Sequence, residues 1–271
     1  MIETTYGIRK RLDFVAGVIS RYRPARVLDM GCGTGANLTA LLAERFQGTQ
    51  FVGVDSDEAS IAYARRENLH GNARYVLESE AGSLGTFDLV IASEVIEHVE
   101  DPDAFLEFLK SRLIANGKIV LTLPNGYGPF EIASLVETIM QLTGIYGALR
   151  AIKRFVRGAA AGTAAADTLA VSPHINFFSY RLIRTLIAGC GLNILEYQPR
   201  TFLCGFGFDQ IMQSGRVVSW NADVAGSLPP QLVSAWMFLL EMGGERRQPV
   251  YQRRAYARLR RYLNEKRWKP R

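Results

Sequence analysis

The feature that most constrains this chain is a short apolar run that ends in a glycine-rich loop. Residues 26–30 (Arg-Val-Leu-Asp-Met) predict a buried strand, and Gly31, Gly33 and Gly35 follow at once. Glycine suits this place because the turn is tight and because the backbone must approach a ligand with no Cβ in the way. A helical pattern through Phe46 follows, so strand, loop and helix form one unit.

A second apolar run, residues 51–55, ends in Asp55 at the spacing expected of a ribose-binding carboxylate, about 20 residues after the loop. Such a carboxylate is positioned to hold both hydroxyls of a ribose. The third glycine of the loop comes one residue earlier than in the dinucleotide pattern G-x-G-x-x-G, which disfavours NAD and FAD. The loop, its flanking elements and Asp55 together predict a cofactor that contains a ribose.

Strands and helices continue to alternate beyond this point, which is typical of βαβ units in a parallel sheet with helices on both faces. Further strands are expected at 74–77, 88–92, 118–123 and 192–197, with a strand or helix at 233–240. Further helices are expected at 58–68, 102–113, 130–155, 180–188 and 208–218. The chain is expected to divide into a cofactor-binding core (1–125), a helical insertion or acceptor lid (126–178), the rest of the core (179–244) and a basic helix or tail (245–271).

The nine residues 27–35 resemble the first motif of class I S-adenosylmethionine (SAM)-dependent methyltransferases. Residues 53–55 resemble the second motif of this superfamily, and residues 87–90 the start of its fourth strand. The resemblance implies an α/β, Rossmann-like fold. It implies a mostly parallel seven-stranded sheet with a reversed last strand, a helical insertion after the fifth strand, and SAM at the carboxyl ends of the strands.

The resemblance also implies which residues bind the cofactor. The glycine loop is expected against the methionine part of SAM, Asp29 near its amino group and Asp55 on its ribose. Ser79, or its neighbour Glu80, is expected near the adenine. The full expected set is Asp29, Gly31, Gly33, Gly35, Asp55, Ser56, Ser79 and Ser93.

A second group of reactive residues follows the fourth strand. If residues 94–99 form a helical turn, Glu94, Glu97 and His98 stand at i, i+3 and i+4 on one face. His174, from a later segment, is a fourth candidate. These four residues could hold a divalent cation (Mg, Mn or Zn), or His98 or His174 could act as general base. The alternative is that they only pack and hydrogen-bond beside the cofactor.

The Glu-x-x-Glu-His arrangement resembles the metal site of small-RNA 3′-end 2′-O-methyltransferases and is similar to ubiquinone-biosynthesis O-methyltransferases. Residues 123–131 and 174–179 resemble segments of bacterial methyltransferases associated with cell-surface polysaccharides. The resulting main hypothesis is O-methylation of a sugar or glycan hydroxyl. The alternatives are a quinone, catechol or lipid-linked phenol, an RNA 2′-hydroxyl, or a SAM-binding partner subunit without turnover. The expected acceptor-pocket residues are Tyr127, Phe130, His174, Asn176 and Phe177.

The net charge of +6 is concentrated at one end of the chain. Residues 245–271 hold eleven Lys or Arg against two Glu, a net +9, which leaves −3 for the rest. This tail is expected to be solvated or to lie on an anionic membrane surface. Nucleic acid is not expected as a partner, because no RNA-binding fold is recognised. Three scattered cysteines and the lack of a signal peptide favour a cytoplasmic protein, with membrane-peripheral association as a second possibility.

Overall fold

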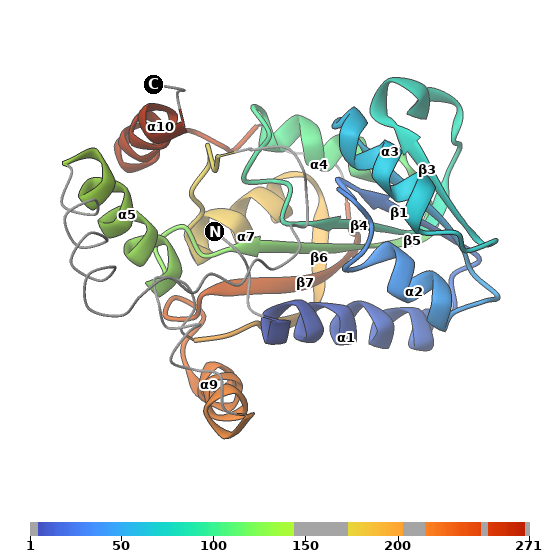
Figure 1. Ribbon diagram of the computed structural model, residues 1–271, viewed down its shortest axis with the longest axis horizontal. Coiled ribbons are helices and arrows are strands. Elements are labelled where there is room, and N and C mark those ends of the chain that lie inside the picture. The colour runs from blue at the N-terminus through green and yellow to red at the C-terminus, as the bar shows by residue number, and fades with distance from the viewer. Residues whose placement is uncertain (1–4, 144–172, 203–214, 245–248, 269–271) are drawn as a thin grey trace, which may run out of the picture.

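In the computed structural model, the residues described are 5–143, 173–202, 215–244 and 249–268 (Figure 1). Seven strands form one sheet in the order β3-β2-β1-β4-β5-β7-β6. The strands are β1 (Arg26–Met30), β2 (Gln50–Asp55), β3 (Ala73–Leu77), β4 (Phe87–Ser93), β5 (Leu113–Pro124), β6 (Leu192–Pro199) and β7 (Ala235–Met242). The helices are α1 (Thr5–Tyr22), α2 (Thr39–Arg45), α3 (Glu58–Glu67), the short η1 (Glu78–Ser83), α4 (Pro102–Ser111), α5 (Pro129–Leu142), α7 (Tyr180–Gly189), α9 (Gly215–Ser227) and α10 (Ala255–Trp268).

The first five strands pair in parallel, whereas β7 lies antiparallel between β5 and β6. This confirms the expected mostly parallel, Rossmann-like sheet with a reversed last strand. All residues from Ala235 to Leu240 are buried, because β7 has strands on both sides and packed layers on both faces. The run at 233–240, which the sequence left open between strand and helix, is therefore a strand.

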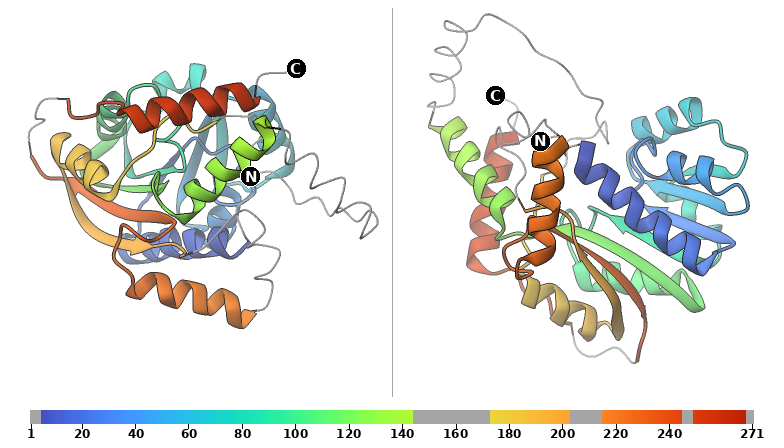
Figure 2. Two further views of the ribbon diagram at one scale, coloured as in Figure 1. Left: turned by 90° about the vertical axis from the view of Figure 1, so that its left-hand side faces the viewer. Right: turned by 90° about the horizontal axis from the view of Figure 1, so that it is seen from below.

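Helices cover both faces of the sheet (Figures 1 and 2). Alternate residues of a strand point to opposite faces, so they pack against different layers. Val27 and its neighbours on one face pack with apolar residues of α1 and α2, and α3 packs on Tyr75 of the same face. Leu28 and its neighbours on the other face pack with α4 and α7. The carboxyl ends of β1, β2, β4 and β5 therefore meet at one edge of this three-layer structure.

Several boundaries differ from those expected from sequence. Helix α1 was not expected, although Phe14, Val15, Val18 and Ile19 form a buried stripe at helical spacing. Strand β5 starts at Leu113 rather than at 118, because residues 114–117 are taken up in a register shift against β4. The helix expected at 130–155 ends at Leu142, with 144–172 outside the described residues.

The helix expected at 208–218 is described from Gly215 to Ser227. It ends shortly before Pro229 and Pro230, which cannot continue a helix. None of the described helices combines the length and the apolar character needed to cross a membrane.

The C-terminal helix α10 lies against α5, as both views of Figure 2 show. These two helices come from segments more than a hundred residues apart in the sequence. The basic region is therefore not a free tail over the residues described, because its helix is packed onto the body of the protein.

Candidate active site

The glycine loop occupies the edge where β1 ends. Gly31, Gly33 and Gly35 have φ angles of 76°, 55° and 69°, in the left-handed region that favours glycine. A Cβ on Gly31 would lie 2.4 Å from a Val95 methyl carbon, and one on Gly35 would lie 2.5 Å from the Tyr75 ring. Only glycine therefore fits at these two positions, where the loop backbone packs directly against Val95 and Tyr75.

Two carboxylates flank the loop. Asp29 is 3% exposed and accepts a hydrogen bond from the Thr39 hydroxyl. Burial raises the pKa of Asp29 to about 6, although Thr39 and the charge of Arg11 oppose the rise. Asp55, half-buried at the end of β2, accepts hydrogen bonds from the backbone N–H groups of Gly33 (2.7 Å) and Asp57 (2.8 Å).

These residues fit SAM. A buried carboxylate with a raised pKa gains a stabilising counter-charge from the amino group of the methionine part. Asp55 stands at the rim of the loop with further lone pairs for ribose hydroxyls. The two carboxylates thus suit the amino group and the ribose of the cofactor.

The three serines of the expected set lie in different surroundings. Ser56 and Ser79 are exposed, just after β2 and in η1, and Ser93 shares a hydrogen bond with the Thr122 hydroxyl (3.0 Å). Their contact with SAM, and that of Ser79 with the adenine, stays a prediction.

The segment after β4 is a tight turn and not the expected helical turn. The His98 N–H donates to the Val95 carbonyl, and Glu94 has a left-handed φ of 59°. The left-handed residue bends the chain as it leaves the strand, so a continuous helical face of Glu94, Glu97 and His98 cannot form. The physical reason is that a right-handed helical turn needs negative φ angles, which Glu94 does not have.

Glu94 is held apart from the other three residues of that group. Its carboxylate accepts hydrogen bonds from the Thr122 hydroxyl (2.8 Å) and from Arg200 (3.1 Å). Burial opposes the charge on Glu94, but the nearby Arg200 and Arg11 outweigh it and lower its pKa. Glu94 is therefore an ionised group that links β5 to the residue after β6.

Glu97, His98 and His174 do come together. One ligand atom from each lies within 4.8 Å of the others, in a geometry that could hold a metal ion. Nε2 of His98 lies 4.0 Å from Glu97 Oε1. The two imidazole rings meet edge-on, with centroids 4.9 Å apart. Backbone N–H groups of Ile175 and Asn176 donate to the Glu97 carbonyl, which ties the two segments to each other.

Glu97 is the unusual member of this cluster. Its side chain is 1% exposed, and neither carboxylate oxygen has a hydrogen-bond partner among the described residues. Burial, followed by the charge of Glu94, raises the pKa of Glu97 to about 8. A buried carboxylate without a partner costs free energy unless a ligand, a proton or a cation satisfies it.

The two histidines are held in opposite protonation states. Burial and the neighbouring charge on His174 lower the pKa of His98 to about 4, so His98 is neutral. Burial also disfavours the charge on His174, but Glu131 outweighs it and raises the pKa of His174 to about 9. Each ring has Nδ1 engaged, by the Pro173 carbonyl in His98 (3.2 Å) and by Glu131 in His174 (2.6 Å). Nε2 is the other nitrogen of each ring, and in His98 it lies 4.0 Å from Glu97 Oε1.

The expected acceptor-pocket residues have divergent roles. Tyr127 is 38% exposed and stacks on Tyr256, with centroids 4.6 Å apart. Phe177 is buried at 2% exposure, and Asn176 is equally buried, so neither lines an open acceptor pocket. Nδ2 of Asn176 donates to the Ile96 and Val99 carbonyls, which fixes the turn that carries Glu97. The side chain of Phe130 is outside the described residues.

The C-terminal region, expected from sequence to be a basic helix or tail, supplies residues that contact this site. Oδ1 of Asn176 accepts hydrogen bonds from the Tyr251 hydroxyl and from Arg253. Arg260, 1% exposed, pairs with Glu131. The only sequence signal for this was the apolar positions of α10, which the density of basic residues obscured.

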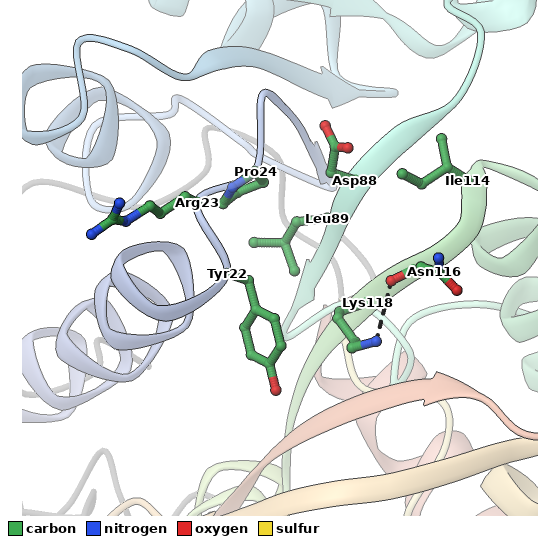
Figure 3. A pocket seen from close by; sticks show the side chains of 8 residues that line it. All are labelled: Tyr22, Arg23, Pro24, Asp88, Leu89, Ile114, Asn116 and Lys118. Carbon is green, nitrogen blue, oxygen red and sulfur yellow. Dashed lines mark hydrogen bonds between the residues drawn. The ribbon is translucent and has the colours of Figure 1, made fainter.

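A surface hollow of about 140 Å³ lies at the opposite edge of the sheet (Figure 3). Its lining residues precede β1 or start β4 and β5, at the amino ends of these strands: Tyr22, Arg23, Pro24, Asp88, Leu89, Ile114, Asn116 and Lys118. Ligands of parallel α/β sheets bind at the carboxyl ends, so this hollow is not the cofactor site.

A seven-stranded sheet with a reversed last strand, a left-handed glycine loop after β1 and a carboxylate at the end of β2 define a class I SAM-dependent methyltransferase. The chain belongs to the methyltransferase domain family, whose model matches residues 3–197.

Curated relatives match about two fifths of the chain. The ubiquinone biosynthesis O-methyltransferase of Rhodopseudomonas palustris (strain TIE-1) is 36% identical over 115 residues, which is 40% of this chain and 44% of the relative. The mitochondrial ubiquinone biosynthesis O-methyltransferase of Schizosaccharomyces pombe is 34% identical over 124 residues, 41% of this chain and 43% of the relative. The chain thus matches less than half of the length of these relatives.

A solved structure supports the fold alone. PKMT2 from Rickettsia typhi in complex with AdoHcy has a TM-score of 0.52 and 17% sequence identity, and the match covers 84% of this chain and 50% of that one.

Proposed function

We propose that this protein transfers the methyl group of SAM to one hydroxyl of a catechol- or quinone-type acceptor. The observation that carries the proposal is Glu97, a buried carboxylate without a partner in the described part of the chain, beside the imidazoles of His98 and His174. The 36% identity to ubiquinone biosynthesis O-methyltransferases supports this acceptor class. It supports the quinone alternative over the sugar hydroxyl that was the main hypothesis from sequence.

The side-chain chemistry of the cluster suits two adjacent oxygens. Glu97, His98 and His174 fit a divalent cation, since a carboxylate and two imidazole nitrogens are common ligands of such ions. Glu97 and His174, whose pKa values are raised to about 8 and about 9, would each release a proton when the cation binds. When bound there, the cation would lower the pKa of an acceptor hydroxyl and hold its oxygen. Holding Mg, Mn or Zn remains part of the proposal.

The residues of the chain themselves orient the acceptor and take up its proton. Neutral His98 offers a lone pair on Nε2, because its Nδ1–H donates to the Pro173 carbonyl. A hydroxyl becomes a strong nucleophile only when its proton leaves, and Nε2 of His98 can accept that proton. Glu97, whose pKa is raised to about 8, can accept it only when its carboxyl is ionised. The oxygen then gains the methyl group and SAM leaves as S-adenosylhomocysteine. The sulfonium is already activated, so alignment of oxygen, carbon and sulfur is the main task of the protein.

The test is transfer of a labelled methyl group from SAM to a catechol with an alkyl tail, compared with a sugar, in metal-stripped protein and with Mg²⁺, Mn²⁺ or Zn²⁺ added. We expect methylation of the catechol, and we expect Glu97→Gln to lower turnover by on the order of 100-fold while S-adenosylhomocysteine still binds. Glu44→Gln, at an exposed carboxylate of α2, is the matched control and keeps wild-type turnover.

Methylation of sugars alone would refute the acceptor class. Tight binding of S-adenosylhomocysteine without turnover on any acceptor would instead favour a non-catalytic partner subunit. Wild-type turnover in Glu97→Gln would remove Glu97 from the mechanism.

A further inference from the structure

A row of buried charged groups connects the C-terminal helix to His174. Glu131 and Arg260 each have side chains that are 1% exposed. One oxygen of Glu131 lies 2.6 Å from Nδ1 of His174, and the other accepts a hydrogen bond from Arg260. A second guanidinium nitrogen of Arg260 donates to the backbone carbonyl of Glu131 (2.9 Å). Arg260 thus holds both the side chain and the backbone of the residue that contacts His174.

Two further contacts fix the same place. The guanidinium of Arg260 lies over the Phe177 ring, 4.9 Å from its centroid. Asn264, one helical turn further along α10, donates to the His174 carbonyl (3.1 Å). The helix therefore contacts His174 at its backbone and, through Glu131, at its ring.

Structural packing alone gives a poor account of this arrangement. Burying an Arg–Glu pair costs desolvation that often equals or exceeds the attraction between the charges, and apolar residues of similar volume would fill the space as well. The pair does, however, determine which nitrogen of His174 is engaged. With Nδ1 held by Glu131, Nε2 is the ring nitrogen directed to the cluster with Glu97 and His98.

We propose that Glu131 and Arg260 are positioning residues that fix the imidazole of His174 for its part in methyl transfer, so that helix α10 completes the active site. The role of His174 in methyl transfer rests on the proposed function, whereas the orientation of its ring by Glu131 and Arg260 does not. Partners of this kind around a functional histidine typically change ligand affinity or activity 10–100-fold when they are altered.

The experiment compares Arg260→Lys and Glu131→Gln with the wild type. Lys keeps the charge but loses the planar fork that grips Glu131 at two points, and Gln keeps the shape of Glu131 without its charge. Arg254→Gln is the control, at an exposed arginine of the same C-terminal region. Three quantities are measured on the full chain: the affinity for S-adenosylhomocysteine, the Nδ1–H signal of His174 in imidazole ¹H–¹⁵N spectra, and kcat and KM on a catechol.

In the wild type we expect a downfield Nδ1–H signal from His174 that exchanges slowly with water. Both variants should lose or broaden this signal and lower kcat by about tenfold or more, with unchanged affinity for S-adenosylhomocysteine. The control should match the wild type throughout. Wild-type spectra in Arg260→Lys and Glu131→Gln would overturn the proposal.

The readouts separate the two proposals. If both variants lose the His174 signal but wild-type protein methylates no catechol, the positioning role stands and the proposed function fails. If Arg260→Lys does not fold, Glu131→Gln alone decides, because it leaves Arg260 in place and removes the charge and one acceptor oxygen of the carboxylate.

Discussion

Asp29 shows how burial at the end of a strand changes a single ionisable group. Its pKa is raised to about 6, chiefly by burial, while Thr39 and Arg11 favour the charged form. The amino group of SAM or of S-adenosylhomocysteine would bind the ionised carboxylate and be opposed by the protonated one.

The affinity for S-adenosylhomocysteine is therefore expected to depend on pH. Above about pH 6 the carboxyl is already ionised, so the affinity should be constant. Below pH 6 a proton competes with the ligand, and the affinity should fall by up to about tenfold per pH unit. Calorimetric titration between pH 5 and 8 measures this. The loss of affinity below pH 6 should be absent in Asp29→Asn. A constant affinity of the wild type from pH 5 to 8 would contradict the contact between Asp29 and the amino group of the ligand.

Asp55 has two roles at the rim of the glycine loop. It accepts the N–H of Gly33, and its place suits the ribose of SAM. We expect Asp55→Ala to weaken S-adenosylhomocysteine binding by on the order of 100-fold, because it loses the ligand contact and loosens the loop. Asp88→Ala, at the amino end of strand β4 and therefore at the opposite end of the strands, is the control for cofactor binding. Unchanged calorimetric affinity in Asp55→Ala would remove this residue from the cofactor site.

Helix α1 illustrates the element scale. It covers one face of the sheet with five buried apolar residues, among them Ile19 at 1% exposure. This helix lies before the first strand, carries no sequence motif and has a low mean hydropathy. It was therefore not expected from sequence.

We expect Ile19→Ala to lower the free energy of unfolding by about 2–5 kcal/mol, through lost burial and the cavity left behind. Urea denaturation checks this. The control is Leu69→Ala, at a leucine that is 81% exposed, where the change should stay within about 0.5 kcal/mol. A similar small loss in both variants would mean that α1 does not pack as described.

At the scale of the whole molecule, charge and packing are linked through the C-terminal region. Arg253 and Arg261 pair with Glu100, while Arg260 is buried against Glu131. The net charge of +9 in residues 245–271 thus includes arginines that make tertiary contacts.

Association with an anionic membrane, the partner expected for this basic region, remains a prediction. Arg254, Arg258 and Lys266 are exposed and are the residues that could meet acidic headgroups. Sedimentation with vesicles of phosphatidylglycerol and phosphatidylcholine tests it. We expect binding at low salt that weakens at high salt and falls in the triple glutamine variant. Vesicles of phosphatidylcholine alone are the control, and equal binding to both would argue against an electrostatic contact.

The sequence by itself determined the strand at 26–30, the glycine loop after it and the strand that ends in Asp55. Local rules suffice there, because a glycine loop must follow a strand directly and Asp55 must end the next strand. Sequence reasoning also identified Glu97, His98 and His174, although it placed the first two on a helix. The structure shows a tight turn after a left-handed Glu94.

Only the tertiary structure decided what surrounds these residues. Glu131, Arg200 and Arg260 approach the site from segments far apart in the chain, and no spacing in the sequence links them to His174 or Glu94. A basic, polar helix is expected at the surface, and Arg260 is buried only because Glu131 satisfies its charge. Contacts of this kind depend on how the helices pack on the sheet, which a local pattern does not encode.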